Sequence, residues 1–458
     1  MVDGPKIVII GAGSASFGLE NLGGIMRHED LQGSTLVLVD TNSNNLNLIT
    51  TLARRMNREW NSKMTIESTT DRTEALADAD FVILSVAVDR EETWKKDHEI
   101  GKKYGIWHYA ENGGPGSFSH TARGIAFIIP ILHDIHDLAP DSWLINFTNP
   151  VPRIHYAANY NEIKCVSYCH QIWHGYSILG RILAADLKIT DYLDWTFEWT
   201  DESFAKSALF LVNAAAEYDI HAAGLNHFTW MMDVKRQETG EDLYPLIRKE
   251  ISNLPPDFEP LTQHMFNIFG LLPVPGDCHL AEYLPYTVTK ENWIRYGIQL
   301  YDFEWSLKRR NKMWEEITGM ATGKRSLDTF VQNPFDRGEY VMAGIFSNSN
   351  SYEAALNITN NGAISNLPDD AVVEVPVILN RMGALGMRMG ALPEGIAALC
   401  QREISQAKLI TKASIEGDRE VALQAFAIDP MINDLSLAET LLDEYLQVHK
   451  KYLPQFFT

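Results

Sequence analysis

Residues 6–17 read KIVIIGAGSASF, and this run decides the fold. KIVII is a continuous apolar run of strand length, and a glycine-rich loop follows it directly. Gly11 permits a tight turn and Gly13 lets the backbone approach a pyrophosphate, whereas Ser16 stands where a third glycine is usual. A strand, a glycine loop and a helix N-terminus in this order predict a dinucleotide-binding unit.

The second apolar run, STLVLVD at residues 34–40, ends on Asp40. A carboxylate at this strand end can accept hydrogen bonds from the adenosine ribose hydroxyls and would repel a 2′-phosphate, so the sequence favours NAD over NADP. A purely structural glycine turn is the alternative. The candidate cofactor contacts are Gly11, Gly13, Ser14, Phe17, Asp40 and, on a later strand, Asn146.

Short runs rich in Val and Ile alternate with helical segments through the first 190 residues. We expect further buried strands at 81–88, 142–149 and 163–169, and helices at 44–60, 91–104, 120–138 and 154–161. This order predicts an α/β fold with a Rossmann-type doubly wound parallel sheet. Ligands of such sheets bind beyond the carboxyl ends of the strands.

The remaining chain is less regular and predicts a second domain of mixed α+β, largely helical structure. Strands are expected near 196–200 and 208–218, helix over 292–320, and nearly continuous helix over 395–453 with a break at Asp429-Pro430. We place the domain boundary between residues 190 and 191, in an overall arrangement similar to that of lactate and malate dehydrogenases.

Composition and charge argue against a protein that binds nucleic acid or spans a membrane. Apolar residues make up 45% of the 458 residues, and the net charge of −21 would repel nucleic acid and an anionic membrane surface. No stretch approaches the ~20 apolar residues of a membrane span, and the N-terminus lacks the pattern of a secretory signal, so a cytoplasmic location is expected. The four scattered cysteines are expected to be thiols.

Polar side chains follow the predicted strands. Asn146 and Asn149 end the strand at 142–149, where they would face the nicotinamide end of the site or cap the next helix. Cys169 and His170 end the following strand, and His227 comes later, after Asn226. A Cys and a His from separate segments can hold a divalent metal, although each alone is more often structural and spacing does not show that they meet.

The segment PGDCHLAEY, residues 275–283, combines a turn with several ionisable side chains. It is either an ordinary loop or the source of a general base.

In order, seven stretches resemble the successive signatures of glycoside hydrolase family 4, the NAD- and metal-dependent α- and β-glycosidases. They are KIVIIGAGSASF (6–17), ENGGPGSFSHTAR (111–123), FTNPVPR (147–153), YCHQIWHG (168–175), GLNHFTW (224–230), NNGAISNLPDDAVVEVP (360–376) and ALPEGIAALC (391–400). The resemblance covers nearly the whole chain.

The resemblance implies a mechanism different from that of glycosidases with two carboxylates. The sugar is oxidised at C3 with NAD⁺, a base removes the acidified proton at C2, and the aglycone leaves C1 by elimination. Water then adds, and the hydride returns from NADH. A divalent metal at O2 and O3, usually Mn²⁺, stabilises the enediolate.

Residue roles follow from the same resemblance. Cys169 and His227 would bind the metal, and Asp277 falls where family members acting on unphosphorylated α-glycosides keep the base. His170 stands where phospho-α-glucosidases have an acidic residue proposed as the general acid, which leaves the proton donor open. The implied substrate contacts are Asn149, Arg153, Asn226, Glu111 and His279.

The implied substrate is a small unphosphorylated α-glycoside, namely an α-glucoside, an α-galactoside or a sugar with an acid at C6. A uronide or a sulfoquinovoside would suit Arg90, His108, Arg123 and Arg153, which we expect in loops near the site. Residues 191–458 would then bind metal and substrate and form a homodimer or homotetramer. The alternatives are an NAD-dependent 2-hydroxy-acid or sugar dehydrogenase and a non-catalytic NAD sensor.

Overall fold

The computed structural model describes residues 4–191, 195–330, 335 and 337–457, without the side chains of residues 16–18. The strands are β1 (Lys6–Ile10), β2 (Thr35–Val39), β3 (Thr65–Thr69), β4 (Phe81–Leu84), β5 (Trp143–Asn146), β6 (Cys165–Ser167), β7 (Tyr218–Leu225), β8 (Phe228–Arg236), β9 (Ser351–Thr359), β10 (Val372–Asn380) and β11 (Gly383–Gly386). Within the described residues they form one sheet in the order β3-β2-β1-β4-β5-β6-β9-β10-β7-β8, with β11 on β10. The first six strands of this order, from β3 through β2, β1, β4 and β5 to β6, are parallel. From the Ser167–Asn357 pair between β6 and β9 onward, neighbouring strands are antiparallel.

Helices cover both faces of the parallel half. They are α1 (Ala15–Arg27), α2 (Ser43–Trp60), α3 (Arg72–Leu76), α5 (Gly116–Leu138) and α6 (Val151–Tyr160). Helix α4 (Arg90–Lys103) packs on α5, and α7 (Gln171–Ile182) packs on α8 (Asp201–Glu217) beside the antiparallel strands. Ile7 and Ile9 of β1 pack into the core that includes α1 and α2, whereas Val8 and Ile10 pack into the core that includes α5 and α6. The four consecutive apolar residues Ile7–Ile10 of β1 are therefore the signature of a strand buried on both faces.

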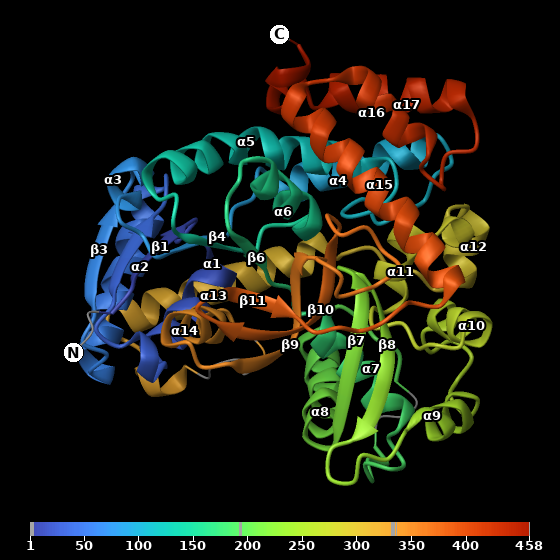
Figure 1. Cartoon of the computed structure of the whole chain (residues 1–458), viewed down its shortest axis with the longest axis horizontal. Helices are drawn as coiled ribbons and strands as arrows, with labels where there is room; N and C mark the ends of the chain where they lie inside the picture. The colour runs from blue at the N-terminus through green and yellow to red at the C-terminus, as the bar shows by residue number, and fades with distance from the viewer. Residues whose placement is uncertain (1–3, 192–194, 331–334, 336, 458) are drawn as a thin grey trace.

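The later helices are α8 (Asp201–Glu217), α9 (Tyr244–Ile251), α10 (Pro260–Phe269), α11 (Asp277–Tyr283), α12 (Lys290–Arg295), α13 (Phe303–Ala321), α14 (Gly338–Ser347), α15 (Glu394–Glu416), α16 (Arg419–Ala427) and α17 (Leu435–Val448). Helices α15 to α17 lie at the top of the molecule in Figure 1, where α15 packs on α5 and α6. The buried ion pair between Arg123 of α5 and Asp97 of α4, at 2.6 Å, is joined by His449 just after α17. The C-terminal helices thus pack directly onto the parallel half.

The predicted fold class is confirmed, and the expected strands and helices of the first 190 residues are present. The edge strand β3 was not predicted, because its sequence TIEST is polar and largely exposed. The helical prediction for 292–320 holds as two helices, α12 and α13. None of the described helices is long and apolar enough to cross a bilayer.

The strands predicted near 196–200 and 208–218 are wrong. Residues 201–217 form α8 instead, and Thr200 caps it by accepting a hydrogen bond from the Ser203 amide. The buried positions Ser203, Phe210 and Ala214 are seven and four residues apart, which is helical spacing. The apolar run FLV over 210–212 imitated a strand, but the alanines around it favour helix.

Candidate active site

A cleft of about 950 Å³ opens at the carboxyl ends of the parallel strands, and Gly11, Gly13, Ser14 and Asp40 line it. Gly11 has a φ of +92°, and a Cβ there would lie 2.0 Å from the Ser85 carbonyl oxygen. A Cβ on Gly13 would lie 2.7 Å from Asp40 Oδ2, which accepts a hydrogen bond from the Gly13 amide at 2.8 Å. Only glycine fits at these two positions, as a loop that cradles a pyrophosphate requires.

Two of the predicted cofactor contacts, Phe17 and Asn146, are not among the described residues that line the cleft. The side chain of Phe17, in α1, lies outside the described residues. Asn146 is buried and donates to the Thr148 carbonyl and Ser167 Oγ, while its Oδ1 accepts from the Thr148 amide at 2.9 Å. Asn146 therefore shapes the strand end, and Thr148 and Asn149 line the cleft.

Cys169 and His227 meet beside this cleft. The Sγ of Cys169 lies 3.5 Å from Nε2 of His227, and the neighbouring His170 and Asn149 line the cleft. His227 occupies the two-residue turn between β7 and β8, with a φ of +60°, a conformation that favours Gly or Asn. Its amide donates to Gln171 Oε1 at 2.8 Å, which ties the turn to the segment that carries Cys169.

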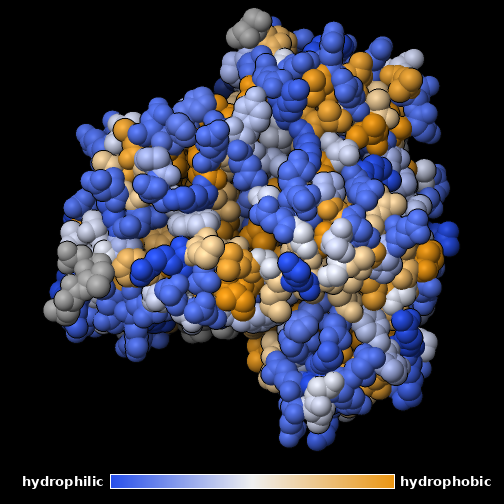
Figure 2. Space-filling view, viewed as in Figure 1, coloured by the Kyte–Doolittle hydropathy of each residue, from blue (hydrophilic) through white to orange (hydrophobic). Residues whose placement is uncertain are grey.

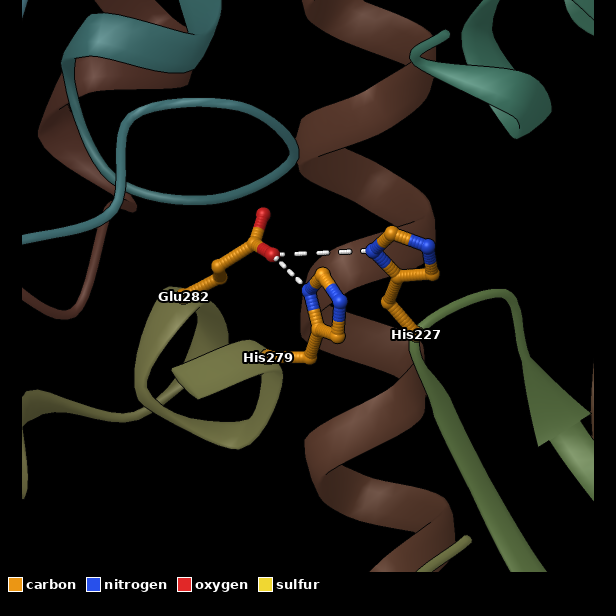
Figure 3. A group of neighbouring side chains, drawn as sticks. All are labelled: His227, His279 and Glu282. Atoms are coloured by element: carbon orange, nitrogen blue, oxygen red, sulfur yellow. Dashed lines mark hydrogen bonds and ion pairs between the residues drawn. The ribbon is translucent and has the colours of Figure 1, made fainter. Parts of the chain in front are cut away.

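Glu282 contacts two neighbouring imidazoles, those of His227 and His279 (Figure 3). Its Oε1 is 3.5 Å from Nδ1 of His227 and 2.6 Å from Nδ1 of His279, and its Oε2 accepts from the Asn112 amide at 2.6 Å. Nδ1 of His227 lies 2.9 Å from Nδ2 of Asn112 as well as near Glu282, so Nε2 is the nitrogen that faces Cys169. A histidine metal ligand whose other nitrogen contacts a carboxylate is a common arrangement, and it sets the tautomer and the ring orientation.

Within this cluster, each charged group shifts the pKa of its neighbours so that their charged forms are favoured. Burial would raise the pKa of the Cys169 thiol, but His227 outweighs it and the pKa is lowered. Burial would lower the pKa of His227, but Cys169 and Glu282 raise it well above its usual value. Burial would likewise raise the pKa of Glu282, but its hydrogen bonds with His227 and His279 keep it low. A divalent cation would satisfy the same anionic sulfur and carboxylate.

A second buried carboxylate holds the turn from the other side. Asn226, next to His227, donates from Nδ2 to Glu374 Oε2 at 2.6 Å, and Asn357 donates to the same oxygen at 2.9 Å. The predicted contact Asn149 donates to Glu111 Oε1 at 3.1 Å. Glu374 could not be found from the sequence, because 148 residues separate it from Asn226.

Asp277 and His279 belong to the same helix, α11, but point to different places. The carboxylate of Asp277 accepts hydrogen bonds from the Leu261 amide at 2.8 Å and from the amide and hydroxyl of Thr262 at 2.7 Å each, at the start of α10. Burial and the nearby Glu259 raise the pKa of Asp277 well above its usual value. His279 instead lies with its ring centre 4.0 Å from that of His227.

The expectation that four cationic residues lie in loops facing the substrate needs correction. Arg123 is in α5, inside the helix predicted over 120–138, and it is buried and paired with Asp97. Arg153 is in α6, buried, and donates to the carbonyl oxygens of Asn112 and Ser117. His108 is also buried, and burial lowers its pKa to about 3. Arg90 is 35% exposed and lines the cleft, 3.4 Å from Glu111.

Comparison with known proteins agrees with this architecture. Residues 6–185 match the model of the family 4 glycosyl hydrolases, and residues 222–432 match that of their C-terminal domain. An α-glucosidase of Erwinia rhapontici is 29% identical, over 98% of each chain. The crystal structure of lplD from Bacillus subtilis has a TM-score of 0.81 at 24% identity, and covers 97% of this chain and 100% of its own.

A 6-phospho-α-glucosidase from gut microorganisms, solved in complex with NAD and Mn²⁺, has a TM-score of 0.78 at 23% identity, and the match covers 99% of this chain and 100% of that one. The two family models together span most of the chain, on both sides of the site. The protein therefore belongs to family 4 of the glycosyl hydrolases, and it is a glycosidase.

Proposed function

We propose that this glycosidase uses NAD and a divalent metal, Mn²⁺ in the first place, to hydrolyse a small unphosphorylated α-glycoside by oxidation at C3 and elimination across C2 and C1. The observation that carries the proposal is the Cys169–His227 pair beside a dinucleotide cleft. A hydrolase that needed only two carboxylates would use neither feature.

The residues present fit both groups. Gly11 and Gly13 leave the space that a pyrophosphate needs, and Asp40 stands where ribose hydroxyls bind. Sulfur and imidazole are donors that suit Mn²⁺ less than oxygen does, but a Cys–His pair leaves positions open for sugar hydroxyls, which supply oxygen. When bound, NAD supplies reversible oxidation of a hydroxyl and the metal supplies Lewis-acid polarisation of sugar oxygens.

The chain's own residues would orient the sugar and move protons. Asn226 contacts Cys169 and precedes His227, and Asn149 lines the cleft, so we assign both to sugar hydroxyls. Asp277 is the base that the family resemblance indicates, yet its oxygens already accept three hydrogen bonds at α10. The position of His279 beside His227 supports this histidine as the alternative base. His170, on the cleft wall, is our candidate for the proton donor to the leaving group.

We also propose that the sugar carries an acid at C6, a uronide or a sulfoquinovoside. Of the four predicted cations, Arg90 supports this best, because it lines the cleft near Asn149 through Glu111. Arg123 also lines the cleft, but it is paired with Asp97. A neutral α-glucoside or α-galactoside is the alternative. A panel of galacturonide, glucuronide, sulfoquinovoside, glucoside and galactoside separates them, and Arg90→Gln should abolish a preference for the acidic members only.

The proposal includes a cytoplasmic location, where the Cys169 thiol would stay reduced, and self-association into a homodimer or homotetramer. Met382, 77% exposed, and Leu385, 41% exposed, support an apolar contact surface at β11, where Figure 2 shows an orange patch. Light scattering at micromolar concentration tests this, and a monomer would contradict it. Residues 1–190 and 191–458 remain our proposed domains.

Turnover of a nitrophenyl glycoside with substoichiometric NAD⁺ tests the function as a whole. The proposed glycosidase releases many equivalents of nitrophenol for each NAD⁺ and accumulates no NADH. A dehydrogenase, the second candidate, would consume NAD⁺ in proportion to product. A sensor would bind NAD without any turnover.

A further inference from the structure

Helix α13 runs along the dinucleotide cleft, although it comes from the C-terminal part of the chain. Besides the glycine loop and Asp40, the cleft is lined by a set of side chains from this helix and from just before it. They are Tyr301, Trp305, Arg309, Arg310, Met313 and Trp314. The positions 305, 309 and 313 and the positions 310 and 314 are four residues apart, so the lining side chains share one face of the helix.

The first part of α13 contributes no fully buried side chain, although Met313 and Trp314 pack against the core while partly buried. The buried residues of the helix are Ile317, Met320 and Ala321, all in its last two turns. Those turns pack against the parallel half, where Arg55 of α2 donates to the carbonyl oxygens of Met320 and Arg325. Ring contacts with Trp94 hold the start of the helix. Between its two ends the helix presents a half-exposed face to the cleft, where a ligand can pack.

The direction of α13 matches the direction of a bound dinucleotide. Tyr301, at its start, stacks on Trp94 with a ring separation of 5.2 Å and lies under the guanidinium of Arg90. Arg90 contacts Glu111, the partner of Asn149, so this is the catalytic end. At ~1.5 Å per residue, Trp314 lies roughly 20 Å further along. Its end of the cleft is therefore the adenosine end.

The charges along α13 also fit. The cleft contains the carboxylates of Glu20, Asp40 and Glu91, and the whole chain carries −21. A pyrophosphate entering this field needs cations beside the glycine-loop amides. Arg310 forms an ion pair with Glu91, and Arg309 stacks on Trp305 at 5.1 Å. Both lie between the two ends of the helix.

We propose that α13 completes the cofactor site, with Arg310 and Arg309 binding the pyrophosphate and Trp314 with Met313 packing against the adenosine. This assigns cofactor contacts to the segment outside the glycine motif and the first 190 residues. The inference rests on the NAD dependence proposed above. Changes at Arg310 should therefore weaken binding of the pyrophosphate, and changes at Trp314 should weaken binding of the adenosine.

Direct binding measurements with NAD, ADP-ribose and adenosine, by calorimetry on the full chain, test the assignment. Arg310→Gln should weaken NAD and ADP-ribose at least 10-fold and leave adenosine unchanged, because only the first two carry the pyrophosphate. Trp314→Ala should weaken all three about 10-fold. Lys308→Gln, exposed on α13 and outside the cleft lining, is the matched control and should bind all three like the wild type.

Glu91→Gln separates phosphate binding from the ion pair. It removes the partner of Arg310, so NAD should bind as tightly as to the wild type or more tightly. A loss equal to that of Arg310→Gln would show that the ion pair alone matters and would overturn the inference. Unchanged NAD binding in Arg310→Gln and Trp314→Ala would also overturn it while leaving the proposed function intact. A wild type that binds no NAD would instead refute the proposed function. Unchanged thermal unfolding verifies that each variant is folded.

Discussion

The Nε2 atom of His227 lies 3.5 Å from the Sγ atom of Cys169, although 58 residues separate them in the chain. Cys169 follows the last parallel strand, β6, and His227 occupies the turn between β7 and β8. The antiparallel extension of the sheet brings these two ends together. The pair therefore depends on both halves of the fold, and it sits beside the cofactor cleft.

The metal should depend on this pair and not on the cofactor loop. Cys169→Ser and His227→Ala should each lose Mn²⁺ binding, measured by electron paramagnetic resonance, and turnover, while NAD binding stays at the wild-type level. Cys165→Ser, four residues before the proposed ligand, should keep both. Full activity in excess EDTA would remove the metal from the account.

Mild oxidation should inactivate the enzyme. The lowered pKa of Cys169 favours its thiolate, the form that peroxide attacks, and a sulfenic acid no longer binds a metal normally. Activity should return with a thiol reductant, and bound Mn²⁺ should slow the loss. Mass spectrometry should find the modification on Cys169. An enzyme indifferent to peroxide would assign Cys169 a structural role.

Glu282→Gln should lower Mn²⁺ affinity about 10- to 100-fold, because the carboxylate that orients His227 through Nδ1 is lost. NAD affinity should change little, whereas the thermal unfolding midpoint should fall, because a neutral amide cannot replace the buried charge beside two imidazoles. Glu439→Gln, exposed on α17, serves as the control. Mn²⁺ binding equal to that of the wild type would mean that Glu282 does not orient the ligand.

Glu403 should make stability depend on pH. Burial, first of all, raises its pKa to about 7, with Asp429 adding and Arg402 opposing. The folded state then keeps a proton that the unfolded chain releases, so wild-type stability falls as pH rises from about 4.5 to about 7. Glu403→Gln cannot ionise, and its advantage over the wild type should grow by up to ~3 kcal/mol across this window. Urea unfolding at pH 5 and pH 8 measures it, and a constant difference would contradict the raised pKa.

Most of the parallel half was predictable because β1, β2, β4 and β5 contain continuous apolar runs and a glycine loop directly follows β1. The polar edge strand β3 was missed for the opposite reason. The same reasoning failed for α8, where the short apolar run over 210–212 satisfies a strand and a helix equally. Cys169 and His227 were predicted from residue type and family resemblance. Glu374 and the contacts of Asp277 were not, because they depend on pairings between segments that only the folded sheet brings together.

The hydrogen at C2 of the sugar tests the central claim most directly. If the substrate is oxidised at C3 and loses a proton from C2, hydrolysis in D₂O should place deuterium at C2 of the released sugar, as read by mass spectrometry or NMR. Deuterium already at C2 or C3 of the substrate should slow turnover where those steps limit the rate. Asp277→Asn and His279→Gln identify the base, since the variant that lacks it loses the exchange while keeping NAD and metal. Product without deuterium at C2 under every condition would contradict the redox–elimination account, because a hydrolase with two carboxylates never breaks that bond.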